Sequence, residues 1–145
     1  MIVFDDAYFM QRALQEAQKA AELGEVPVGA VVVVQQQIIA RAHNLTEKLH
    51  DVTAHAEMQA ITAAAHFLGG KYLNDCTLYV TLEPCTMCMG ALYWSQIGRV
   101  VFGAHDPKRG YQSVGGDPHP KTAVLGGIME AEAAAVLHDF FRSKR

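Results

Sequence analysis

The sequence is poor in cysteine and in charge, and it has no long apolar run. Among its 145 residues there are only three cysteines, which cannot all pair, so a disulfide-stapled secreted scaffold is not expected. No apolar stretch approaches the roughly 18 residues that span a membrane, and the first ten residues carry acids where a secretory signal carries bases. We therefore expect a cytoplasmic protein.

The charged residues are few, and positive and negative side chains are present in nearly equal numbers. Charged residues make up 19% of the chain and the net charge is −3, so the composition neither demands a nucleic-acid partner nor suggests disorder. Apolar residues make up 50%, which is enough for a chain of this length to bury one core. We predict a single domain over residues 1–145.

Alternating helix and strand patterns predict a layered α/β domain with a partly parallel sheet. Helices are expected over residues 5–23, 53–67, 84–97 and 130–145. Strands are expected over residues 26–34, 37–42, 76–82, 99–104 and 122–129, of which the first two form a hairpin. Gly29 inside the first strand predicts the close approach of another group. Residues 105–121 contain three prolines and three glycines, so we expect a long functional loop.

Two cysteines and one distant histidine form a predicted zinc site. Catalytic zinc uses three thiolate or imidazole ligands and leaves the fourth position to water. Cys85 and Cys88 are three positions apart, so at about 100° per residue one helix start presents both to one ion. The helix N-terminus also favours the thiolate form of Cys85. His55 is the best third ligand, and we predict one Zn²⁺ per subunit.

Glu57 follows His55 by two positions and is the predicted catalytic residue. Two thiolates cancel the charge of Zn²⁺, so the ion acidifies its water less than a site with only neutral ligands would. A nearby carboxylate must then accept the proton of that water. We predict that His55 holds the metal while Glu57 moves protons.

Other interpretations fit parts of this pattern. Cys85 and Cys88 alone are compatible with a redox dithiol, although that leaves His55 and Glu57 unexplained. A non-catalytic zinc module that binds RNA or protein would need a fourth protein ligand. The available candidates are Cys76, His43, His50 and His66. Cys76 is expected to be a buried thiol.

The segments "HAE" at 55–57 and "PCTMC" at 84–88 resemble the signature of zinc-dependent nucleobase deaminases. Several further stretches resemble the bacterial tRNA-specific adenosine deaminases; these are "EVPVGAVVV", "HDVTAHAE", "IGRVVFGAHDPKRG" and the terminal "LHDFFRSKR". The resemblance implies a three-layer αβα cytidine deaminase-like sandwich with a mixed five-stranded sheet. It also implies a homodimer that converts the wobble adenosine of a tRNA anticodon stem-loop to inosine.

The same resemblance implies substrate contacts. Asn44 would hydrogen-bond the target nucleoside, the less favoured alternative being a turn residue, and Val28 and Ala30 would line the base pocket. The C-terminal residues Phe140, Phe141 and Arg142 would meet the anticodon loop, although adjacent helix positions cannot both face one core. Candidate phosphate contacts are Lys108, Arg109, Lys121, Arg142, Lys144 and Arg145. Core and dimer-interface positions are expected at Met87, Met89, Leu92, Tyr93 and Trp94.

Two features leave the size of the substrate open. Arg109 and Tyr111 stand in the loop after Asp106 where many members of that family have small residues. The segment "ALYWSQ" resembles the free-base guanine deaminases of the same superfamily. The alternative function is therefore deamination of a free base or nucleoside such as guanine or cytosine.

Overall fold

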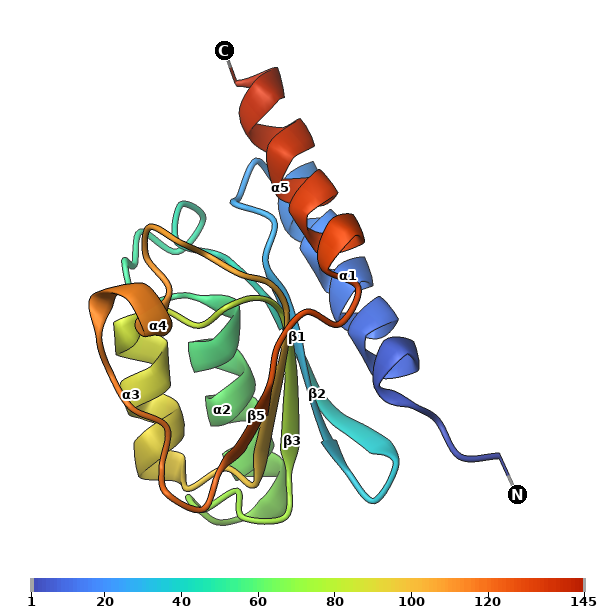
Figure 1. Ribbon diagram of the computed structural model, residues 1–145, viewed down its shortest axis with the longest axis vertical. Helices are drawn as coiled ribbons and strands as arrows, with labels where there is room; N and C mark the ends of the chain where they lie inside the picture. The colour runs from blue at the N-terminus through green and yellow to red at the C-terminus, as the bar shows by residue number, and fades with distance from the viewer. Residues whose placement is uncertain (1, 145) are drawn as a thin grey trace.

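The computed structural model describes residues 2–144, which form a mixed sheet between two layers of helices (Figure 1). The strands are β1 (Gly29–Val34), β2 (Gln37–His43), β3 (Thr77–Leu82), β4 (Arg99–Ala104) and β5 (Ala123–Leu125). They lie in the order β2-β1-β3-β4-β5. β1 is antiparallel to β2 and β3, whereas β3, β4 and β5 are parallel. The predicted αβα fold class with a mixed five-stranded sheet is confirmed.

Helices cover both faces of the sheet (Figure 1). α1 (Asp6–Glu22) and α5 (Glu130–Ser143) lie on one face, and α2 (Ala56–Leu68), α3 (Thr86–Ser95) and α4 (Tyr111–Val114) lie on the other. No helix within residues 2–144 is long and apolar enough to cross a membrane.

β1 is buried on both faces, as its unbroken apolar sequence predicts. Successive side chains of a strand point to opposite faces, so the strand contributes to two cores. Ala30 and Val32 belong to the core under α2, whereas Val31 and Val33 pack with Phe9 of α1. The central strand thereby ties the two helical layers together.

Several predicted boundaries differ from those observed. α2 begins at Ala56 rather than at residue 53, because His55 has extended dihedral angles and is the N-cap. α3 begins at Thr86 with Cys85 as its N-cap, so Pro84 precedes the helix and does not occupy its first turn. The predicted loop over residues 105–121 contains the short helix α4. β5 ends at Leu125 because the chain turns away at Gly127, whose φ is +88°.

Gly29 is where α1 approaches β1 most closely. A Cβ atom at this position would overlap the carbonyl oxygen of Ala13 and the backbone nitrogen of Ala17. The Gly29 N–H donates to the Thr81 hydroxyl at 3.1 Å, which also fixes the start of β1 against β3. The predicted close approach at Gly29 is thus made by the backbone of α1.

We predict that Gly29→Ala destabilises the protein by about 2 kcal/mol or more, because the added methyl group must displace helix backbone and not a flexible side chain. The measurement is urea unfolding of the zinc-loaded protein. Gly70→Ala is the matched control, since nothing lies within 4 Å of the Cβ position there. Equal stability of the two variants would contradict the assigned contact between α1 and β1.

Candidate zinc centre and active site

Two helix N-termini bring the three predicted metal ligands together. His55 is the N-cap of α2, Cys85 is the N-cap of α3, and Cys88 lies in the first turn of α3. The Nδ1 atom of His55 lies 3.7 Å from Sγ of Cys85 and 3.4 Å from Sγ of Cys88. Tetrahedral zinc with ordinary bond lengths places a nitrogen and a sulfur ligand about 3.6 Å apart. The three side chains therefore have the spacing that one zinc ion requires.

The surroundings of Cys85 favour the form of this side chain that binds a metal. The pKa of Cys85 is lowered to about 4, first because of its hydrogen bond with the Cys88 thiol and further by the His55 imidazole. The positive end of the α3 dipole acts in the same direction. The hydrogen bond with Cys85 in turn raises the pKa of His55. Cys85 thus presents a thiolate, which is the form that binds zinc.

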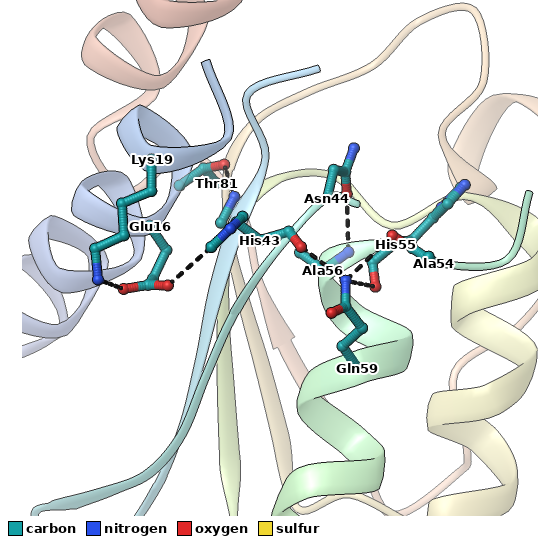
Figure 2. A network of polar contacts seen from close by, with 10 residues as sticks. Glu16, Lys19, His43, Asn44, Ala54, His55, Ala56, Gln59 and Thr81 are labelled. Atoms are coloured by element: carbon teal, nitrogen blue, oxygen red, sulfur yellow. Dashed lines mark hydrogen bonds and ion pairs between the residues drawn. The ribbon is translucent and has the colours of Figure 1, made fainter. Parts of the chain in front are cut away.

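Hydrogen bonds to the backbone fix the approach to α2 (Figure 2). The side-chain oxygen of Asn44 accepts a hydrogen bond from the Ala56 N–H at 2.8 Å, which satisfies a free donor at the helix N-terminus. The Gln59 amide donates to the carbonyl oxygen of His43 at 2.7 Å and to that of Ala54 at 3.2 Å. The end of β2 and the turn before His55 are therefore held in one hydrogen-bonded unit.

Glu57 is the unusual acid of the site. Its side chain is 3% exposed, yet Oε1 has no hydrogen-bond partner within the described chain. Burial is the main cause that raises the pKa of Glu57 to about 7. A buried carboxyl oxygen without a partner is costly unless a ligand satisfies it. A pKa near neutrality also suits a group that accepts and returns protons.

A cavity of about 690 Å³ opens above these ligands. Its lining includes eight of the predicted site residues, which are Val28, Asn44, His55, Glu57, Cys85, Lys108, Arg109 and Phe141. One cavity is therefore lined by metal ligands, by the candidate for proton transfer and by candidate substrate contacts. These residues come from distant parts of the sequence.

Five predicted contacts of the described residues lie outside the lining of this cavity, and two of them are Lys121 and Lys144. Ala30 is fully buried within β1, and Phe140 is partly buried on α5. Arg142 is exposed and forms an ion pair with Asp139 at 3.0 Å. The ligand Cys88 is also absent from the lining, because it is fully buried beside His55. Arg145, a predicted phosphate contact, lies outside the described residues.

Sequence patterns did not reveal other residues of the cavity. Glu83 and Asp106 lie beside the metal-binding turn, and Leu137 lies one helical turn before Phe141 on α5. The four-residue spacing of Leu137 and Phe141 places both on one helix face, which is a detectable signal. Glu83 directly precedes Pro84 and Cys85, but an acid at that position has no role that spacing alone reveals.

Within residues 2–144, the one group of metal-binding side chains consists of His55, Cys85 and Cys88. A fourth protein ligand from Cys76, His43, His50 or His66 is not found there, which disfavours the structural zinc module. Cys85 and Cys88 are both free cysteines, so no disulfide bond joins them.

The family profile described as the cytidine and deoxycytidylate deaminase zinc-binding region matches residues 4–104, which include all three ligands and Glu57. This chain belongs to the cytidine and deoxycytidylate deaminase family. Zinc is therefore the cofactor, and His55, Cys85 and Cys88 form its candidate site. The predicted membership in the deaminase superfamily and its fold are confirmed.

Individual deaminases are similar over 70% or more of this chain. The tRNA-specific adenosine deaminase of Agrobacterium fabrum is 46% identical over 144 residues, which are 95% of either protein. A solved structure from work on A-to-I editing by tRNA:A34 deaminases at the wobble position is 44% identical, with a TM-score of 0.81 over 89% of this chain and 98% of that chain. The guanine deaminase of Bacillus subtilis is 39% identical with a TM-score of 0.67, covering 70% of this chain and 66% of that one.

We predict that Cys85→Ser abolishes stoichiometric zinc binding, because a hydroxyl group is a poor replacement for a thiolate ligand. Zinc content after gel filtration, measured by mass spectrometry, tests this. Cys76→Ser is the matched control: Cys76 is also a free and buried cysteine, but it lies outside the ligand cluster. Retention of zinc by the Cys85 variant, or its loss from the Cys76 variant, would contradict the assigned ligands.

Proposed function

We propose that this protein is a zinc-dependent hydrolytic deaminase that converts the wobble adenosine of a tRNA anticodon to inosine. The observation that carries the proposal is the unpartnered Oε1 of buried Glu57 in the same cavity as the three-ligand cluster. The choice of a tRNA substrate is supported by the tRNA-specific adenosine deaminase that is 46% identical over 95% of the chain. We also propose that residues 1–145 act as a single deaminase domain, in the cytoplasm where tRNA is used.

When bound by His55, Cys85 and Cys88, zinc supplies a Lewis acid that lowers the pKa of a water molecule. Glu57 accepts the proton released from that water. It gives this proton to the ring nitrogen next to C6 of adenine, then takes a second proton from the new C6 hydroxyl group and passes it to the departing amine. Adenosine and water thereby give inosine and ammonia, and Glu57 returns to its starting state.

Asn44 is positioned to hold the nucleoside. Its Oδ1 is already engaged by the Ala56 N–H, so the amide orientation is fixed and Nδ2 remains as the donor on the cavity side. The proposed partner is an acceptor atom of the target nucleoside. Asn44 would thus couple the position of the substrate to the start of α2 at Ala56, one residue before Glu57.

The proposed RNA contacts lie at the rim of the cavity. Lys108 and Arg109 supply positive charge there, and Phe141 supplies an aromatic face that is half exposed. Single-stranded loops are bound by such combinations of phosphate contacts and stacking, with the target base turned out of the loop. Phe140 and Arg142 extend the same helix beyond the cavity and are proposed to contact the anticodon loop there.

A homodimer with one zinc per subunit is also part of the proposal. Met87, Tyr93 and Trp94 of α3 are exposed, and Trp94 is 78% exposed. Buried Met89 and Leu92 face the core from the same helix. Exposed aromatic residues in such a cluster are typical of protein interfaces. A sedimentation experiment that found only monomers at micromolar concentration would contradict the homodimer.

A single assay separates the proposed substrate from its rival. The zinc-loaded protein is incubated with an anticodon-arm RNA that carries adenosine at the wobble position, and in parallel with guanine, cytosine and adenosine. We expect inosine and ammonia from the RNA, with a rate that falls as salt rises because phosphate contacts are screened. Product from guanine but not from the RNA would contradict the tRNA substrate while leaving the deaminase chemistry intact.

We predict that Glu57→Gln retains zinc but lowers kcat at least about 100-fold, because the amide cannot transfer protons. Single-turnover conversion of the anticodon-arm RNA and zinc content are measured on one preparation. Glu47→Gln is the control, since the hydrogen bond of Glu47 to Glu25 is made by the backbone N–H, which the substitution leaves in place. Normal turnover by the Glu57 variant would exclude Glu57 as the proton carrier.

A further inference from the structure

A second buried acid, Glu83, lies at the edge of the zinc centre. It follows the last residue of β3, is 3% exposed, and precedes the ligand Cys85 by two positions. Its Oε1 accepts the N–H of Asp106 at 2.9 Å, and its Oε2 accepts the N–H of Gln112 at 3.0 Å. Both oxygens are therefore engaged, in contrast to the unpartnered Oε1 of Glu57. This geometry excludes Glu83 as a second proton carrier and gives it a different role.

Residues 106–112, which we call the rim loop, wrap around this carboxylate. A Cβ atom at Gly110 would overlap the carboxyl group of Glu83, so the loop passes directly over it. Gly110 forms an isolated β-bridge with Cys85, and the Tyr111 N–H donates to the carbonyl oxygen of Pro84 at 2.9 Å. The rim loop is thus attached to the same turn that carries a metal ligand.

The rim loop carries the two cations at the mouth of the cavity. The side-chain oxygen of Asp106 accepts the backbone N–H groups of Lys108 at 3.2 Å and Arg109 at 3.1 Å, which folds the tip of the loop. Both side chains line the cavity. Among residues 2–144, neither forms an ion pair with an acidic side chain, so both charges remain available to an anion.

We propose that Glu83 is a positioning residue for RNA: its two hydrogen bonds hold the rim loop so that Lys108 and Arg109 meet the phosphates on either side of the target nucleotide. This inference rests on the proposed tRNA substrate. It separates the roles of the two buried acids, because Glu57 serves the reaction whereas Glu83 serves the binding of the polynucleotide. The fixed acceptor geometry explains why a carboxylate is needed, since an amide has only one acceptor oxygen for two N–H donors.

The test is a mutant cycle on the zinc-loaded protein with the anticodon-arm RNA as substrate. We expect Glu83→Gln to raise KM about ten-fold, with kcat changed less than about two-fold and zinc retained, because one charge-assisted hydrogen bond is lost. In a Lys108→Ala, Arg109→Ala background the same substitution should leave KM unchanged, since the cations that it positions are gone. Glu130→Gln is the matched control, because this exposed acid accepts the N–H of His105, next to the rim loop, from the surface.

Amide hydrogen exchange on the unmutated protein gives a second readout that needs no variant to fold. The Asp106 amide should be protected although it lies in a loop, and the Gln112 amide should be protected although the first turn of α4 offers it no helical acceptor. Three results would each overturn the role of Glu83. The first is rapid exchange of both amides in the unmutated protein. The others are a fall in kcat at constant KM in Glu83→Gln, or a KM effect of Glu83→Gln that persists without Lys108 and Arg109. An unmutated protein that forms no inosine from the RNA would overturn the proposed function and this inference together.

Discussion

The meeting of two helix N-termini at one point is the constraint on which the rest of this structure depends. His55 and Cys85 are both N-cap residues, and their side chains converge with Cys88 to the spacing of a tetrahedral zinc site. Helix N-termini carry partial positive charge, which stabilises thiolate and would otherwise oppose a divalent cation. The two cysteines resolve this conflict, since they supply negative charge at the place where the dipole favours it.

Buried carboxylates hold the loops on either side of the cavity. Glu83 accepts two backbone N–H groups from the loop that follows β4. Glu25, which is 1% exposed, accepts the N–H groups of Glu47 at 3.0 Å and Lys48 at 2.7 Å in the loop that follows β2. Each buried charge is compensated by backbone donors and needs no cation. The loops on either side of the cavity are therefore held by buried acids that lie next to β1 and β3.

Local sequence patterns predicted the chemistry of the site better than its surroundings. The grouping of His55, Cys85 and Cys88 could be predicted because thiolate and imidazole are the donors that zinc prefers, and Cys85 and Cys88 are close enough in sequence to share one helix start. Glu83 could not, because its partners, Asp106 and Gln112, are more than twenty residues away and contribute only backbone atoms. Phe140 and Phe141 were indistinguishable in sequence, and only the packing of α5 places Phe141 at the cavity. The N-cap of α2 was missed because helix propensity extended the predicted helix back to Thr53. In the structure His55 has extended dihedral angles, so the helix begins only after it.

Hydrolytic deamination assisted by Glu57 requires a zinc ion with three protein ligands and one position open to solvent. X-ray absorption at the zinc edge of the loaded protein measures that coordination directly. We expect two sulfur ligands, from Cys85 and Cys88, at about 2.3 Å. We also expect two lighter atoms at about 2.0 Å, which are the His55 nitrogen and a water oxygen that small anions can replace. A shell with three sulfur atoms, or with two histidine nitrogens and no exchangeable atom, would contradict it, because no place would then remain for the water that Glu57 must deprotonate.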